Sequence, residues 1–103
     1  MSNLRRAWTA ANPLALQTIS LSNSTAIAVN STTRGAHVLH ISVETNDVRY
    51  RADGTAPALT TGVLLQKDVD YWFINYDGTS QLKFQRSTGT AKVFIQPYQY
   101  VNE

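Results

Sequence analysis

The sequence has 103 residues, the length of one ordinary domain. Hydrophobic residues make up 43% of it, which is too many for a disordered chain. The net charge is only +2, so no nucleic acid is expected as the main partner, because that would need clustered Lys or Arg. The chain has no cysteine, which excludes disulfides and cysteine-based metal sites. No apolar run approaches the roughly 18 residues of a membrane span, so no membrane partner is expected.

The first 13 residues differ from the rest and are predicted to form an N-terminal arm or a single helical turn. Pro13 ends any short helix there. Arg5 and Arg6 are not followed by an apolar run, so this segment is not expected to be a signal peptide. Residues 14–103 are predicted to form one domain.

Apolar residues then recur with a period of two, which predicts strands. In chain order, we expect strands over residues 14–21, 26–30, 36–43, 48–51, 71–76, 81–86 and 90–95. Leu39, Ile41 and Val43 share one face of their strand, and Arg49 and Arg51 point away from the core. Residues 71–76 are apolar on both faces, which is typical of a strand that lies centrally or beneath a partner.

Turn residues separate these strands. Asp77-Gly78 predicts a hairpin between residues 71–76 and 81–86, and Gly89 suggests a second one between 81–86 and 90–95. Pro97 predicts that residues 97–103 form an edge or a tail. About seven or eight short strands with no helical stripe indicate an all-β fold, an antiparallel β-sandwich or a jelly-roll-like barrel.

No catalytic, metal or cofactor site is expected. His37 and His40 are three apart in a predicted strand and point to opposite faces, so they do not readily chelate one ion. Asp68 and Asp70 are interpreted as a solvated turn, although paired carboxylates can also perform acid–base chemistry or hold calcium. A catalytic Ser-His-Asp triad remains an alternative, because such a triad is defined by its geometry and not by a sequence motif. The chain is therefore not expected to be an enzyme.

Basic and aromatic side chains are the candidate contact residues. The basic candidates are Arg49, Arg51, Lys83 and Lys92. If their strands share a sheet, these side chains form a basic row on its outer face that could bind an acidic partner. The alternative is that they belong to an ordinary solvated face. Trp72 is expected in the core or in a subunit interface, because so large a ring is seldom left bare. Tyr98 and Tyr100 suit an interface or a core equally, and an exposed aromatic side chain would also suit sugar stacking.

The order of several segments carries a resemblance. Asn-Leu-Arg-Arg-Ala-Trp occupies residues 3–8, and Val-Arg-Tyr-Arg-Ala-Asp-Gly-Thr-Ala-Pro-Ala-Leu-Thr-Thr-Gly-Val-Leu-Leu occupies residues 48–65. Asp-Tyr-Trp-Phe follows at residues 70–73, and Gly-Thr-Ala-Lys-Val follows at residues 89–93. From about residue 14 to residue 96, this order resembles small β-sandwich structural proteins of tailed bacteriophages.

The resemblance implies a non-enzymatic virion protein, most directly a capsid decoration or cement protein on the capsid surface, made in the host cytoplasm. It implies a homo-oligomer, a dimer or a trimer, that binds the major capsid protein or another virion protein. The partner-binding residues expected on this basis are Leu4, Arg5, Arg6, Trp8, Arg49, Arg51, Tyr98 and Tyr100. A small tail or head–tail component and a carbohydrate-binding β-sandwich module remain the alternatives.

Overall fold

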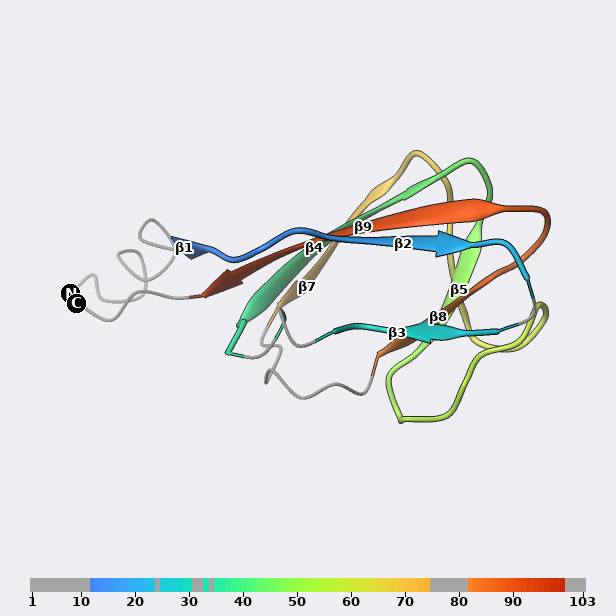
Figure 1. The fold of residues 1–103 in the computed structure, drawn as a ribbon, viewed down its shortest axis with the longest axis horizontal. Helices are drawn as coiled ribbons and strands as arrows, with labels where there is room; N and C mark the ends of the chain where they lie inside the picture. Colours follow the sequence, from blue (N-terminus) through green and yellow to red (C-terminus); the bar gives the residue numbers. More distant parts are fainter. Residues whose placement is uncertain (1–11, 24, 31–32, 34, 75–81, 100–103) are drawn as a thin grey trace.

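A computed structural model of the chain describes residues 12–23, 25–30, 33, 35–74 and 82–99. These residues form two antiparallel sheets that stack as a sandwich (Figure 1), so the predicted all-β sandwich is confirmed. The strands are β1 (Asn12–Pro13), β2 (Gln17–Leu21), β3 (Ile27–Ala28), β4 (Val38–Glu44), β5 (Val48–Arg51), β6 (Val63–Leu65), β7 (Asp70–Ile74), β8 (Lys83–Arg86) and β9 (Ala91–Gln99). Within the described residues, no helix is long and apolar enough to cross a membrane.

Sheet A has the order β1-β9-β4-β7, and β2 also pairs with β9. Sheet B has the order β3-β8-β5-β6. The alternation in β4 places Leu39, Ile41 and Val43 on the inner face of sheet A, where each is 0% exposed. Phe84 of β8 and Val48 of β5 face them from sheet B and are equally buried. Burial of each such side chain stabilises the fold by about 1.5–3 kcal/mol.

Both predicted hairpins are wrong, because the strands they were to join lie in different sheets. β7 pairs with β4 in sheet A, whereas β8 pairs with β3 and β5 in sheet B. β9, in turn, pairs with β2 and β4 in sheet A. A turn residue such as Gly89, with φ +59°, lets the chain reverse its direction. It does not decide whether the returning strand pairs beside the previous one or crosses to the opposite sheet.

Among the described strands, β7 lies at the edge of sheet A and not centrally. Its inward residues Tyr71 and Phe73 pack against the core, and the Phe73 ring contacts that of Tyr50 in sheet B at a centroid distance of 5.1 Å. Its outward residues Trp72 and Ile74 are exposed. A strand that is apolar on both faces is therefore found here at the edge of the sheet.

Pro97 belongs to β9, not to an edge or a tail. A β-bulge in the neighbouring strand accommodates it: Pro13 pairs with Tyr98 and Gln17 with Ile95, so one extra residue faces β9 between these pairs. The Leu14 amide donates to the Pro97 carbonyl at 2.9 Å, but proline has no amide to return. The Nε2 amide of Gln96 donates to the Leu14 carbonyl instead, at 2.7 Å.

We expect Gln96→Leu to lower the free energy of unfolding by about 1–2 kcal/mol, because it leaves the part-buried Leu14 carbonyl without its donor. In a Pro97→Ala background the same change is expected to cost less, since alanine supplies the missing amide. Urea denaturation of the four members of this double-mutant cycle measures the difference. Equal costs in both backgrounds would show that the Gln96 side chain does not replace the proline amide.

Candidate functional site

The structure describes three of the eight predicted partner-binding residues. Arg49, Arg51 and Tyr98 lie in β5 and β9. The other five fall outside the described residues: Leu4, Arg5, Arg6, Trp8 and Tyr100. The predicted arm and the predicted domain meet at Asn12 and Pro13, which form β1 and pair with β9.

Arg49 braces a loop. Its Nε donates to the Leu59 carbonyl at 3.0 Å, and its Nη1 donates to the Gly62 carbonyl at 2.9 Å. These carbonyls belong to residues 52–62, which connect β5 to β6, and Pro57 in this loop is buried. A half-buried guanidinium that makes two charge-assisted hydrogen bonds to loop carbonyls holds that loop against its own strand. Arg49 therefore positions the loop, whereas the sequence suggested that it contacts a partner.

Arg51 is paired with Asp53 on the same loop. Its Nε donates to one carboxylate oxygen at 3.1 Å, and its Nη2 contacts the other. The Thr55 amide donates to the same carboxylate. The Arg51 hydrogen bond, followed by that of the Thr55 amide, lowers the pKa of Asp53 from 3.8 to about 2. The pair borders an open hollow of about 580 Å³ that Tyr50 and Val63 also line.

The Asp53 carboxylate makes the stability of this loop pH-dependent. Because its pKa is lower in the folded chain, its contribution is present above about pH 4 and is lost as the pH falls from about 4 to about 2. Asp53→Asn is expected to lower the urea midpoint at pH 5 and to leave it almost unchanged at pH 2. A difference between the two proteins that stays constant over this range would contradict the assignment.

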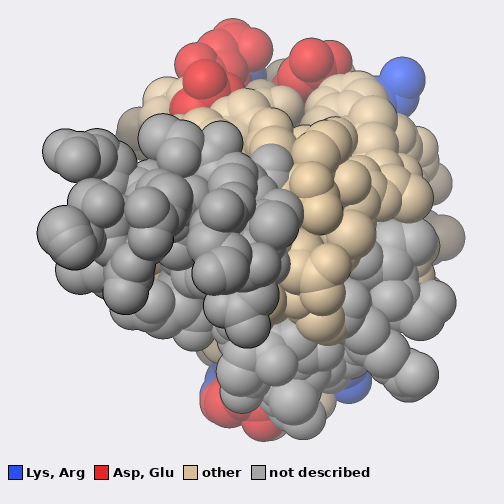
Figure 2. All heavy atoms as spheres, turned by 90° about the vertical axis from the view of Figure 1, so that its left-hand side faces the viewer, with Lys and Arg blue, Asp and Glu red and all other residues tan. Residues whose placement is uncertain are grey.

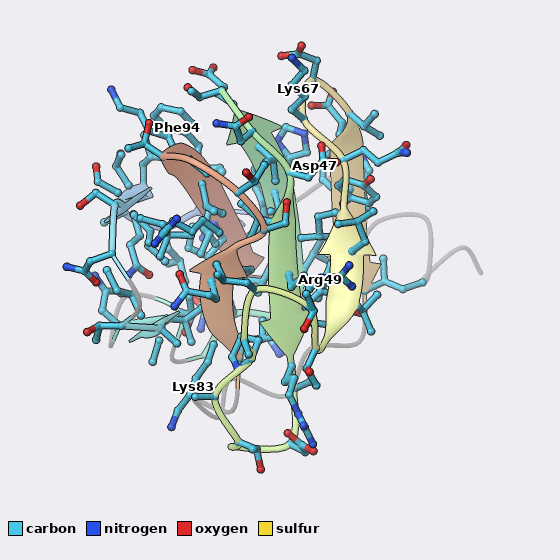
Figure 3. The ribbon with its side chains drawn as sticks, turned by 90° about the vertical axis from the view of Figure 1, so that its right-hand side faces the viewer. Asp47, Arg49, Lys67, Lys83 and Phe94 are labelled. Atoms are coloured by element: carbon cyan, nitrogen blue, oxygen red, sulfur yellow. The ribbon has the colours of Figure 1, made fainter. Side chains whose placement is uncertain are left out.

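The four basic residues do not share one sheet, so the condition for a row of all four is not met: Arg49, Arg51 and Lys83 lie in sheet B, and Lys92 lies in sheet A. Arg51 pairs with Lys83 across β5 and β8 in sheet B. Lys92 lies in β9 of sheet A, two residues from Phe94 on the same face and opposite Glu44 of β4. Figure 3 shows Phe94 and Lys83 on opposite sides of the sandwich. The alternation correctly predicts that these side chains point outward, but it does not show which sheet each strand joins.

An aromatic cluster occupies the outer face of sheet A, and we call Trp72, His40 and Tyr98 the aromatic face. His40 lies opposite Trp72 in β7, and the two rings are 4.5 Å apart. Trp72 stacks beside Tyr98 of β9, at a ring distance of 6.2 Å and an interplanar angle of 28°. Trp72 is 57% exposed, so the alternative that placed it in the core is wrong.

Neighbouring side chains frame the aromatic face. The Asp70 carboxylate lies 3.4 Å from Nε2 of His40 and forms an ion pair when the imidazole is protonated. Figure 2 looks at the end of the sandwich where β9 ends, and its described surface there is mostly uncharged, with both acidic and basic groups at the upper and lower edges of the view. Within the described residues, no group of three or more His, Asp or Glu side chains is placed to hold a metal ion.

This arrangement suits binding. On adjacent strands of one sheet, the Trp72 ring contacts those of both His40 and Tyr98, and this preorganised cluster can be covered by a partner at small entropic cost. The sequence singled out Tyr98 as a contact candidate, whereas it considered His40 only as a metal ligand or as part of a catalytic triad. Their proximity follows from the pairing of β4 with both β7 and β9, which no local pattern shows.

Comparisons with protein-family models, with curated proteins and with solved structures found no match to this chain.

Proposed function

We propose that this chain is a non-enzymatic structural protein of a tailed-phage virion, most directly a capsid decoration protein. It binds the outside of the shell through the aromatic face of sheet A, and its partner is the major capsid protein or another virion protein. The observation that carries the proposal is the exposed Trp72 ring, which contacts the half-buried rings of His40 and Tyr98. The resemblance of residues 14–96 to small phage structural proteins supplies the class of partner.

The aromatic face has the properties of an interface centre. Trp and Tyr dominate the energetic hot spots of protein interfaces, because they bury large areas while few rotatable bonds are fixed. Here β4, β7 and β9 hold the rings, and their inner faces form the core. The rings are therefore carried by strands whose inner faces are packed in the core.

Charged side chains near the aromatic face favour registration against the shell. Asp70 lies beside His40, and Glu44 faces Lys92 farther along the same outer face. Such rim charges contribute to the association rate and to orientation more than to affinity. We assign to these charges the orientation of the protein on its partner, which the sequence analysis expected of Arg49 and Arg51. The guanidinium groups of those two residues instead form hydrogen bonds and an ion pair within the chain.

Co-sedimentation with shells tests the proposal. Shells of the phage that encodes this chain are stripped of it, mixed with the purified protein and pelleted over a concentration series. Tyr98→Ser is expected to weaken binding at least about tenfold, because it removes one ring of the aromatic face. Leu59→Ser is the matched control, since it removes an exposed apolar side chain from the loop of sheet B and should leave binding unchanged. No binding by the wild-type protein, or equal binding by both variants, would refute the proposal.

A carbohydrate-binding function is the second candidate. One observation favours it: the exposed Trp72 ring lies near the Asp70 carboxylate, and a sugar would need both a stacking ring and a hydrogen-bond acceptor. A Trp8→Phe variant leaves Trp72 as the one tryptophan, so its fluorescence reports on this face alone. Quenching by glycans from an array would favour this candidate over shell binding, and an unchanged emission would remove it.

A further inference from the structure

We infer that the free edge of β7 is a self-association surface, through which two copies pair antiparallel around a twofold axis at Trp72. The inference does not depend on shell binding. It concerns the side of the sandwich formed by β6 and β7, which we call the β6–β7 side. Its residues extend from Val63 to Ile74 and include the turn that joins the two strands.

Both strands on this side have an unused hydrogen-bonding edge within the described part of the chain. β7 pairs only with β4, and β6 pairs only with β5. Figure 3 shows β6 and β7 on the same side of the sandwich, at the right of the view. Natural edge strands are commonly protected by Lys, Pro or a bulge, because open backbone groups invite a further strand. None of the five residues of β7 is Lys or Pro.

The β6–β7 side is also where most exposed large apolar side chains of the described residues gather. Their exposed fractions are 55% for Val63, 39% for Leu64, 40% for Val69, 57% for Trp72 and 56% for Ile74. Together these five residues expose on the order of 450 Å², against about 800 Å² per partner in a stable interface. Trp72 and Ile74 lie on the outer face of sheet A beside the proposed seam, whereas Leu64 is paired with Arg49 on the outer face of sheet B, so the pairing covers only part of this apolar area.

The sequence of β7 complements itself. When two β7 strands pair antiparallel around Trp72, the two Trp72 rings lie opposite each other on the outer face. Asp70 of each copy then lies opposite Ile74 of the other, and Tyr71 opposite Phe73 on the inner side. The two A sheets become continuous, so both aromatic faces point to the same side. A dimer of this form would bind a repetitive surface with two sites at once.

Sedimentation equilibrium of the purified protein, without shells, tests the inference with a pair of charge variants. In the proposed register, position 74 lies opposite the partner's Asp70. Ile74→Glu therefore places like charges opposite each other twice per dimer, whereas Ile74→Lys places opposite charges there. Both variants lose the same apolar side chain, yet we expect the glutamate variant to dissociate at about tenfold lower concentration than the lysine variant. A monomeric wild-type protein at 100 µM, or equal dissociation constants for the two variants, would overturn the inference.

A disulfide gives a second readout that does not depend on charge. The chain has no cysteine, so Trp72→Cys introduces a single thiol. Mild oxidation is expected to yield a covalent dimer, because two cysteines form a disulfide only when their Cα atoms are about 4.4–6.8 Å apart. Thr18→Cys, exposed on β2 at the opposite edge of sheet A, should stay mostly monomeric. Equal cross-linking of both variants would overturn the inference, and since no shell is present, this result is separate from failure of the proposed function.

Discussion

Phe84→Ala is expected to lower the free energy of unfolding by about 3–5 kcal/mol. Phe84 is 0% exposed and is the largest of the fully buried side chains among the described residues. It pairs with Tyr50 and Ile27 in sheet B and faces the core of sheet A, so its removal leaves a cavity between the sheets. Urea denaturation followed by far-UV circular dichroism measures the loss.

Phe94→Ala is the matched control, because it removes the same ring from the outer face of sheet A. Phe94 is only half-buried, and its replacement is expected to cost about 1 kcal/mol. The ratio between the two costs reports which face of the sandwich holds the core. Equal losses for the two variants would contradict the assignment of inner and outer faces.

Gly62→Ala is expected to destabilise the chain by about 2–4 kcal/mol, because two effects add. Gly62 has φ +130°, a conformation that residues with a side chain rarely adopt. A Cβ atom there would also lie 2.9 Å from the Tyr50 carbonyl oxygen and 3.2 Å from Cβ of Pro57. The Tyr50 carbonyl is backbone of a sheet strand and cannot move aside cheaply.

Gly35→Ala serves as the control for this prediction. Gly35 has a positive φ of +78°, but a Cβ atom would meet only the Nε2 end of the Gln99 side chain, at 3.2 Å. A flexible side chain can shift, so the cost is limited to the backbone conformation and is about 1 kcal/mol. Thermal unfolding of both variants separates the two cases. If Gly62→Ala lowered the free energy of unfolding no more than Gly35→Ala does, the close contact between position 62 and the Tyr50 carbonyl would be contradicted.

The alternation of side chains was sufficient to predict seven of the nine described strands and their inner faces, but it missed β1 and the three-residue β6. Leu39, Ile41 and Val43 are buried as the period of two requires, and Arg49 points away from the core. These features are local, because neighbouring residues of one strand decide them.

The pairing of the strands was not predictable in the same way. Asp77-Gly78 and Gly89 mark places where the chain changes direction, but contacts between distant residues decide which strand lies alongside which. Asp47 illustrates such contacts: its carboxylate accepts the Lys67 amide at 2.9 Å, and its backbone carbonyl accepts the Ser87 amide at 3.0 Å. Turns distant in the sequence meet at this residue (Figure 3), and no local pattern shows it.

The candidate site shows the same limit. The sequence singled out Tyr98 as a contact candidate, and Tyr98 lies on the aromatic face. It could not show that Trp72 stands at an edge, since an apolar strand suits a central position as well. It also could not show that Arg49 and Arg51 are engaged by their own loop, because the carbonyls of Leu59 and Gly62 carry no sequence signal.

The orientation of the protein on its partner tests the central claim most directly. A cryo-EM reconstruction of shells saturated with this protein would resolve the two sheets of each bound copy. We expect the outer face of sheet A to lie against the shell, with Trp72, His40 and Tyr98 within contact distance of it. A reconstruction in which sheet B or the loop of residues 52–62 contacts the shell, while the aromatic face points to solvent, would contradict it.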